Sequence, residues 1–405
     1  MSPLLTRLIY CVLLPAAIFL SSHSSALAEA DRNVTIFTVN SLADPGSGSC
    51  DEIECTLRSA IVAASGAIGS TAIEFEEGLS GAITLGSELY INFNGLSING
   101  PGPDVIELSG NDATRVFRTF NSDVAIRGLT IRNGIAPEPS PNAFGAGIYI
   151  SNKGDVLLEN LRVTNNSNAN QGSGIYVSFA TATIRNVEIS DNVGDYGALL
   201  INGGTNHPVL IENTTISGNS GNQLASALFI VPTETQNVTL RYVTVSNNSG
   251  SARAAGIYGS GGTTHIEASI FAGNDAPSGD LVDNNGNVTI NNSIIGNLDG
   301  SVTGANNLVD ADAQLQPLMF WNGSVTRVHP SGDGPARDHV DNTVGNAGCG
   351  TTVTQDQIGN PRPSGLRCDA GAYESPDEPD SIFQDRFEMI ELLQSAIASH
   401  GSGRH

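Results

Sequence analysis

The residues of this sequence that could best form a reactive site are clustered carboxylates. They lie in three local pairs, Asp191 with Asp195, Asp280 with Asp283, and Asp310 with Asp312. Two carboxyl groups that flank a glycosidic bond can hydrolyse it, and carboxylate oxygens can also hold calcium. We favour the simpler interpretation that all six are solvated turn residues. The sequence therefore predicts no catalytic residue, no metal site and no cofactor, and it leaves weak calcium binding open.

Histidine is the commonest general base in enzymes, but here it is scattered. No acid or nucleophile recurs at a shared spacing from the histidines after the N-terminal segment, which are His207, His265, His329, His339, His400 and His405. A nucleophile needs a base within hydrogen-bond reach. We interpret these histidines as loop residues.

A nine-residue pattern indicates the elements that must position all these side chains. It reads apolar, x, small or Asn, x, x, apolar, x, x, Asn, and its copies start at residues 126, 158, 184, 211, 240, 266 and 290. Each copy contains short β-branched strands separated by Gly, Asn and Ser turns. The recurrence predicts a parallel β-helix, in which each coil pairs with the next one.

The second position of each copy tests this stacking, because it would form one outward column. Its residues alternate in charge: Arg127, Glu159, Arg185, Glu212, Arg241 and Glu267. Opposite charges on adjacent strands attract and like charges repel. We therefore expect neighbouring coils to touch at these residues, which form a structural charge column.

The last position of the pattern is asparagine in five copies, Asn166, Asn192, Asn219, Asn248 and Asn274. Asparagine tolerates left-handed backbone, so we expect these residues at corners that need it. Stacked amides can also hydrogen-bond along a column. A row of ligand-binding amides is the functional alternative, which we do not favour.

A second motif falls between the copies and predicts a surface. The residue flanked by inward apolar neighbours should point outward, which gives a stripe of Tyr149, Tyr176, Leu200, Phe229 and Tyr258. Exposed apolar patches often mark binding sites, and tyrosine rings offer flat faces suited to sugars. We expect a ligand-binding stripe here. The alternatives are that a loop covers the stripe or that the stripe only stabilises the sheet.

The N-terminal residues have the order of a secretory signal peptide. Arg7 precedes an apolar run from Leu8 to Leu20, and small residues follow it up to Ala28. No later apolar stretch is long enough to span a bilayer. We expect residues 1–28 to be removed and the mature chain to be exported, to the cell surface, the extracellular medium or the periplasm.

Four further cysteines fall into two local pairs, Cys50 with Cys55 and Cys349 with Cys368. In an exported protein such pairs predict disulfides. Metal ligation is the weaker alternative, because no histidine stands near them at zinc spacing.

Composition divides the mature chain into four segments. Residues 29–115 would hold the N-terminal cap and the first coils, with Leu57, Ile61 and Ala64 on one face of a short capping helix. Residues 116–310 carry the repeats. Residues 311–375 lose the repeat and contain Trp321, which predicts a C-terminal capping region, and residues 376–405 form an acidic tail that we expect to be flexible.

Three blocks of residues resemble families of bacterial secreted proteins. Residues 35–44 followed by Cys55-Thr56-Leu57-Arg58-Ser59-Ala60-Ile61 resemble the CSLREA motif, with Thr56 and Ser59 as departures. The coils resemble polymorphic outer-membrane-protein repeats. Residues 356–363 and 368–374 are similar to the C-terminal block of choice-of-anchor Q domains. This resemblance implies export and an all-β, right-handed parallel β-helix with a pectate-lyase-like solenoid, and it implies no defined reaction.

The charge of the chain limits the classes of partner that we expect it to bind. The formal net charge of −23 would repel the phosphates of a nucleic acid, so we expect no nucleic-acid partner. It also opposes long acidic polysaccharides. We expect a binding, adhesion or scaffold protein that takes an extracellular glycan or cell-surface polymer. The alternative is a polysaccharide lyase or glycoside hydrolase that uses the turn carboxylates.

Overall fold

The computed structural model describes residues 34–45, 48–136, 143–204, 206–231, 236–250, 253–259, 262–283, 288–321 and 323–376. The predicted signal peptide and residues 377–405 of the predicted tail lie outside the described residues. The chain divides into two compact units, Met1–Val34 and Thr35–His405, and the second unit holds every element below. Within the described part, no helix has the length and hydropathy needed to cross a bilayer.

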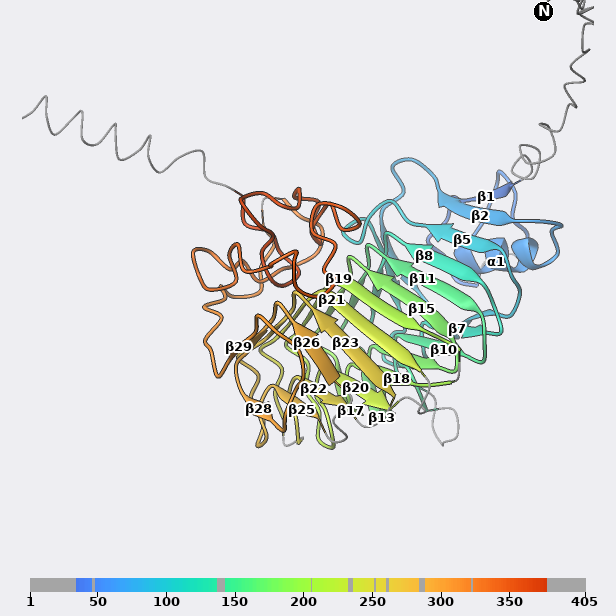
Figure 1. Cartoon of the computed structure of the whole chain (residues 1–405). Coiled ribbons are helices and arrows are strands. Elements are labelled where there is room, and N and C mark those ends of the chain that lie inside the picture. Colours follow the sequence, from blue (N-terminus) through green and yellow to red (C-terminus); the bar gives the residue numbers. More distant parts are fainter. Residues whose placement is uncertain are drawn as a thin grey trace, which may run out of the picture. The chain divides into compact units, whose positions relative to one another are not determined.

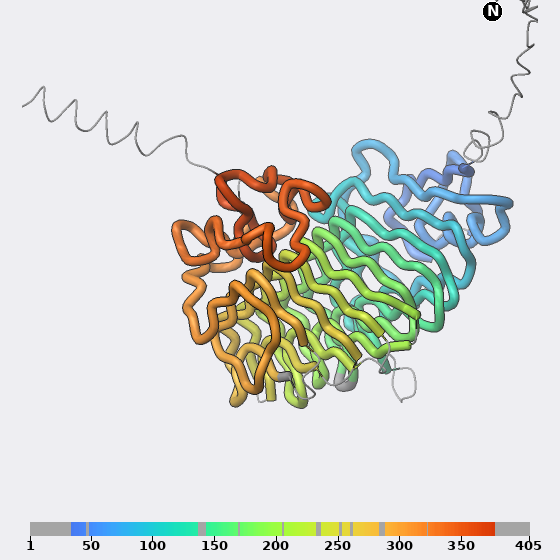
Figure 2. The backbone as a smooth tube through the Cα atoms, viewed as in Figure 1, coloured from blue at the N-terminus to red at the C-terminus, as the bar shows by residue number. Residues whose placement is uncertain are grey.

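The second unit is a right-handed parallel β-helix, as the repeat and the resemblance predicted. Consecutive coils lie beside one another in chain order (Figures 1 and 2). One face is a nine-stranded parallel sheet of β4 (Leu89–Ile91), β7 (Phe117–Phe120), β10 (Ile148–Ser151), β14 (Ile175–Ser178), β18 (Leu199–Asn202), β20 (Leu228–Val231), β22 (Ile257–Gly259), β25 (Leu281–Asp283) and β28 (Leu298–Asp299).

Eighteen further strands form a sheet made of two adjoining rows. The first row contains β1 (Thr35–Val39), β2 (Thr71–Phe75), β5 (Leu96–Asn99), β8 (Val124–Arg127), β11 (Asp155–Glu159), β15 (Thr181–Arg185), β23 (Thr263–Glu267) and β26 (Val288–Asn291). The second row contains β3 (Gly81–Thr84), β6 (Ile106–Ser109), β9 (Thr130–Arg132), β12 (Arg162–Thr164), β16 (Glu188–Ser190), β24 (Ile270–Phe271), β27 (Ile294–Ile295) and β29 (Leu308–Val309). The long strands β19 (Val209–Ser217) and β21 (Asn237–Ser246) run through both rows.

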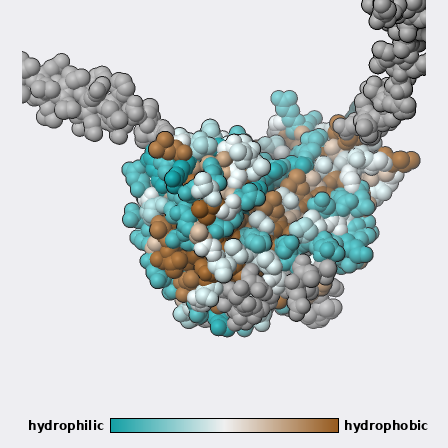
Figure 3. Space-filling model, viewed as in Figure 1, coloured by the Kyte–Doolittle hydropathy of each residue, from teal (hydrophilic) through white to brown (hydrophobic). Residues whose placement is uncertain are grey.

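Apolar side chains of the nine-residue pattern fill the interior. Leu158, for example, aligns with Ile126 in the coil before it and with Ile184 in the coil after it, and all three are fully buried. Ladders of like residues on stacked strands bury their apolar surface together. On the outer face of the eighteen-stranded sheet, Leu157 and Leu210 stay half exposed, and apolar patches alternate there with hydrophilic ones (Figure 3).

The predicted N-terminal helix is present as α1 (Leu57–Ser65). Thr56 caps it, because its hydroxyl oxygen accepts a hydrogen bond from the Ser59 N–H. Leu57, Ile61 and Ala64 are buried in the core. Arg58 pairs with Asp44 at 2.6 Å and also donates to the carbonyl oxygen of Glu88 at 3.0 Å. The helix is therefore tied to the connection that precedes β4.

The C-terminal segment, residues 311–376, lies along the second strand row and contacts coils far back in the sequence. It contains no helix or strand among its described residues. Gln357 accepts a hydrogen bond from the Thr215 hydroxyl at 2.6 Å, and the Arg362 guanidinium stacks on the Tyr242 ring at 4.1 Å. The segment thus covers the flank of the solenoid in addition to its last coils.

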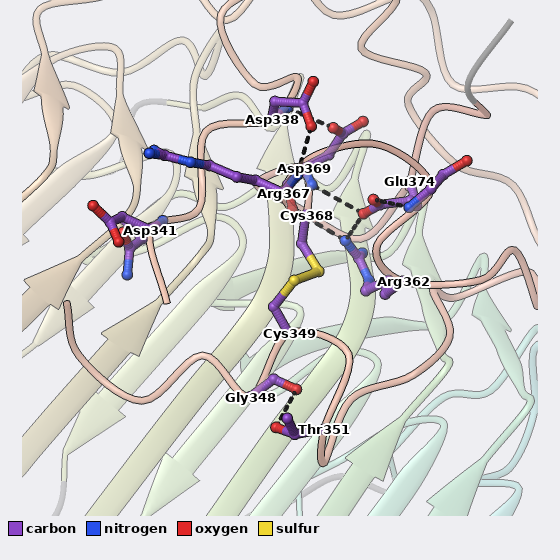
Figure 4. Close-up of a disulfide and its surroundings, with 12 residues drawn as sticks. Asp338, Asp341, Gly348, Cys349, Thr351, Arg362, Arg367, Cys368, Asp369 and Glu374 are labelled. Atoms are coloured by element: carbon purple, nitrogen blue, oxygen red, sulfur yellow. Dashed lines mark hydrogen bonds and ion pairs between the residues drawn. A yellow bond between two sulfur atoms is a disulfide. The ribbon is translucent and has the colours of Figure 1, made fainter. Parts of the chain in front are cut away.

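Both predicted disulfides are formed, Cys50–Cys55 beside α1 and Cys349–Cys368 within the C-terminal segment. Around the second one, Arg362 forms a fully buried ion pair with Glu374 at 2.6 Å. The Asp369 carboxylate accepts from the Asp338 N–H, and the Asp338 carboxylate accepts from the Arg367 N–H (Figure 4). The segment is therefore held by ordered polar contacts in the absence of regular secondary structure.

Candidate functional site

The charge column stacks in the predicted register and serves the solenoid itself. Glu159 receives Arg127 from one neighbouring coil at 2.9 Å and Arg185 from the other at 2.5 Å. Arg241 pairs with Glu212. Arginine neighbours lower the pKa of Glu159 against the opposing effect of burial. Glu267 aligns with Arg241 but forms no ion pair with it in the described structure, and its Oε1 accepts a hydrogen bond from Asn291 at 2.9 Å.

The five repeat asparagines form a buried amide row. Each side-chain N–H donates to the next side-chain oxygen: Asn166 to Asn192 at 3.0 Å, Asn192 to Asn219 at 3.0 Å, Asn219 to Asn248 at 2.9 Å, and Asn248 to Asn274 at 2.8 Å. Asp280 ends the row by accepting from Asn274 at 2.6 Å. The first four asparagines are fully buried, so ligands cannot reach them.

The prediction of left-handed backbone at these asparagines is wrong by one position. The left-handed residues directly precede them, at Asn165, Asp191, Gly218, Asn247 and Gly273, with φ between 54° and 74°. The ladder asparagines must point inward to bond the neighbouring coil, and the residue before each one makes the turn. The third position of the pattern supplies a second left-handed corner, for example at Asn160 and Asn186.

The predicted aromatic stripe does stack in register, on the outward side of the nine-stranded sheet. We call this column the outer ladder. Its exposure was predicted wrongly: Tyr176 is 3%, Leu200 1%, Phe229 7% and Tyr258 5% exposed. Tyr149 remains partly buried. Most of the outer ladder therefore cannot bind a ligand.

Connecting segments cover the outer ladder. Two of them form strands of their own, β13 (Ser167–Gln171) and β17 (Val193–Tyr196), which pair with each other. The Phe144 ring stacks on Tyr176 at 4.9 Å and the Tyr196 ring on Phe229 at 6.0 Å. The connections stack from coil to coil like the strands, and so they close over the ladder as the alternative interpretation allowed.

The outer ladder is exposed to solvent at its N-terminal end. Two earlier coils extend the column, because Tyr149 aligns with Arg118 and Arg118 aligns with Tyr90. Tyr90 is 42% exposed. The connection before β4 comprises only residues 85–88, whereas that before β14 comprises residues 165–174. This short connection leaves Tyr90 exposed, and the neighbouring Arg118 side chain is 27% exposed.

Arg118 lies between the two tyrosines, at 5.3 Å from the Tyr90 ring centre and 5.8 Å from that of Tyr149. Such cation–π contacts hold a guanidinium in place. Its Nη1 is 3.8 Å from the Glu88 carboxylate, and its buried Nε has no hydrogen-bond partner among the described residues. The guanidinium is thus positioned with one donor unused.

Arg115 is a buried neighbour of this site. It is 1% exposed, donates Nε to the carbonyl oxygens of Phe144 and Gly145, and forms an ion pair with Glu88. Burial lowers the pKa of Arg115 while Glu88 raises it. Among the described residues, two guanidinium groups therefore approach the Glu88 carboxylate. This arrangement can bind an oxygen-bearing group beside aromatic faces.

The carboxylate pairs of the sequence do not form a reactive site in the described structure. Asp191 pairs with Arg327 at 2.7 Å, while Asp195 accepts from Asn222 at 3.4 Å. Asp280 ends the asparagine row, and the Asp283 side chain lies outside the described residues. Asp310 is exposed, and Asp312 accepts from the Gln314 N–H. No group of three or more potential metal ligands occurs in the described part.

One histidine has the geometry of a base beside a nucleophile. The Nε2 of His329 is 2.8 Å from the Ser217 hydroxyl, and its Nδ1 donates to the Gln316 carbonyl oxygen at 2.8 Å. Both side chains are buried, at 2% and 1% exposure. Burial lowers the pKa of His329. The pair fastens the C-terminal segment and offers a substrate no access. His207, His265 and His339 lie apart from it, and His400 and His405 are outside the described residues.

Sequence analysis missed Tyr90 and Arg118. Their strands have the same apolar-x-apolar form as the later ones, in Leu89-Tyr90-Ile91 and Phe117-Arg118-Thr119. The apolar-x-apolar form could have identified both strands. It did not lead to Arg118, because the strands of the predicted stripe have an aromatic residue or leucine at that position.

Comparisons with known proteins gave one family match and one similar solved structure. Residues 115–297 match the family described as right handed beta helix region. The crystal structure of pectate lyase Pel9A is similar at a TM-score of 0.39 and 14% identity, covering 84% of this chain and 96% of that one. A comparison with curated proteins found no match. The sheet topology is that of a right-handed parallel β-helix, and the family match over residues 115–297 agrees with it.

Proposed function

We propose that this protein is exported and acts outside the cell or at its surface as a non-catalytic glycan-binding or scaffold protein. Its binding site would be the exposed end of the outer ladder, formed by Tyr90, Arg118 and Tyr149. The observation that carries this proposal is the guanidinium of Arg118, which lies between two tyrosine rings on a side chain that is 27% exposed. The two disulfides support an oxidising, extracytoplasmic compartment.

The ligand we propose is an acidic sugar residue within an otherwise neutral glycan. Arginine binds carboxylates through strong, directed hydrogen bonds, and tyrosine faces suit sugar rings. A long polyanion would meet the repulsion of a chain with formal net charge −23. A single acid group beside the Arg118 guanidinium meets less of that repulsion than a long polyanion does.

Catalysis is the less favoured function, because two of the carboxylates that could serve it are engaged. Asp191 and Asp280 hold structural partners at 2.7 Å and 2.6 Å. A panel of acidic and neutral polysaccharides tests this directly, by assay of new reducing ends and of ultraviolet absorbance from unsaturated products. We expect neither signal. Release of new ends or double bonds would favour the lyase or hydrolase alternative.

Binding is tested on a glycan array followed by calorimetry with the retained glycan. We expect Arg118→Ala to weaken binding at least tenfold, a loss of about 1.4 kcal/mol. Arg132→Ala is the matched control, because Arg132 also pairs with a glutamate, Glu107 at 2.7 Å, and lies on the second strand row. Equal retention by the wild type and Arg118→Ala would refute the site.

A further inference from the structure

A cavity opens on the C-terminal segment. It measures about 360 Å³, and its walls include Gln316, Met319, Trp321, Pro330, Asp333 and Tyr373. Cavities of this size lie at the small end of the range for ligand sites, and such sites combine apolar walls with a few polar groups. It belongs neither to the outer ladder nor to the charge column.

Two aromatic rings form adjacent walls of this cavity. The rings of Trp321 and Tyr373 are 6.2 Å apart and meet at 79°. Two hydrogen bonds join Trp321 and Ser324: the Trp321 N–H donates to the Ser324 hydroxyl at 3.0 Å, and the Ser324 N–H donates to the Trp321 carbonyl oxygen at 2.9 Å. Burial raises the pKa of Tyr373 to about 12, so its phenol stays neutral. The aromatic walls are therefore uncharged.

Polar groups stand at the mouth of the cavity. Asp333 and Arg337 form an ion pair at 2.6 Å, and the Asp333 side chain is 93% exposed. Gly332 adds no side chain between them and the rings, and the space around its α-carbon is open. Carboxylate and guanidinium groups beside aromatic faces supply the acceptors and donors that sugar hydroxyls need.

We propose that this cavity binds the terminal residue of a neutral oligosaccharide. The pyranose ring lies against Trp321, and its hydroxyl groups bond Asp333 and Arg337. An exposed ion pair of this kind contributes little to folding, so its groups can exchange partners when a ligand arrives. The site is separate from the one at the outer ladder and does not depend on the proposed function of that ladder.

The chain carries its own probe for this site, because Trp321 is its only tryptophan. We would titrate the whole protein with cellotriose, maltotriose and mannotriose and follow intrinsic fluorescence. We expect a saturable change in tryptophan emission with at least one trisaccharide. We expect Asp333→Asn and Arg337→Ala to weaken that change at least tenfold, and Arg118→Ala to leave it unaltered. Circular dichroism would confirm that each variant is folded.

Several results would overturn the proposal. One is the absence of a saturable change with all three sugars. Another is a change that both Asp333→Asn and Arg337→Ala leave intact, which would place the sugar elsewhere. A saturable response to a proline-rich peptide without any response to sugars would assign the cavity to a different ligand class. Loss of the signal in Arg118→Ala alone would show one site at the outer ladder, and the proposed function would then survive without this one.

Discussion

Asparagine side chains replace water as hydrogen-bond partners for one another inside this solenoid. Asn219 accepts from both the backbone N–H and the side chain of Asn192 at 3.0 Å, and donates to the carbonyl oxygen of Ile189 at 3.0 Å. Buried polar groups are tolerated when every partner is satisfied. The asparagine row therefore specifies which coil lies against which.

Removing one asparagine side chain from the row should destabilise the protein, because its buried hydrogen-bond partners would be left unsatisfied. We expect Asn219→Ala to lower the free energy of unfolding by about 1–3 kcal/mol, measured by chemical denaturation. Asn222→Ala is the control, because that exposed side chain makes a single contact, with Asp195 at 3.4 Å. A loss in the control as large as in Asn219→Ala would contradict a special role for the row.

Much of this residue-level order could be predicted. Alternating charge at one position of the repeat predicted the contacts of Glu159 with both neighbouring arginines, and recurring asparagine predicted stacked amides. The position of the left-handed corner could not be predicted in the same way. Asn165 and Asn166 are both asparagine, and composition alone does not show which of two adjacent amides turns the chain and which one faces inward.

At the scale of the elements, strands were easier to predict than the connections between them. The motif Gly-Ile-Tyr fixed the register of Tyr149 on Tyr176. The cover over Tyr176 came from segments such as β13, whose polar residues read as a loop. Whether a connection closes over a sheet depends on its length and on its own coil-to-coil pairing, and a strand pattern records neither. For this reason the exposed end of the ladder was not predicted.

Protonation of His329 should loosen the C-terminal segment from the solenoid. Burial, together with nearby Arg327, lowers the pKa of His329 below 6.5, while the Gln316 carbonyl and Glu188 act in the opposite direction. A folded pKa below the unfolded one contributes stability above pH 6.5 that is lost as the pH falls toward the folded value. Burial lowers the pKa of His339 as well.

We therefore expect the segment to become more sensitive to limited proteolysis between about pH 7.5 and about pH 5. His329→Gln keeps a hydrogen-bonding side chain without the titration and should flatten that pH dependence, apart from the part that His339 supplies. A variant that retains the full dependence would show that His329 does not control it.

At the scale of the whole molecule, the solenoid and the C-terminal segment are built on different principles. The coils rely on repeated apolar ladders, such as Ile126 under Leu158. The segment relies on single contacts, among them the buried pair of Arg362 with Glu374 and the bond between Cys349 and Cys368. Repetition made the fold predictable. The segment has no internal repeat, and neither its place along the flank nor its Trp321 cavity could be derived from the sequence.

The Cys349–Cys368 disulfide should stabilise that segment selectively. It closes a loop with a sequence separation of 19 residues, for which chain entropy predicts about 3 kcal/mol. We expect the double variant Cys349→Ser and Cys368→Ser to raise hydrogen exchange in residues 323–376 and to leave β8 to β16 protected. Uniform loss of protection across those strands would mean that the segment and the coils unfold as one unit.

The coils lie in space in the order in which the ribosome makes them (Figure 2). Each newly emerged turn of chain can add to the one just completed without waiting for distant residues. The segment that fastens the flank is translated after the coils, and the carbonyl oxygen of its Val325 accepts a hydrogen bond from Arg162, made 163 residues earlier. The coils are therefore translated before the segment that contacts their flank.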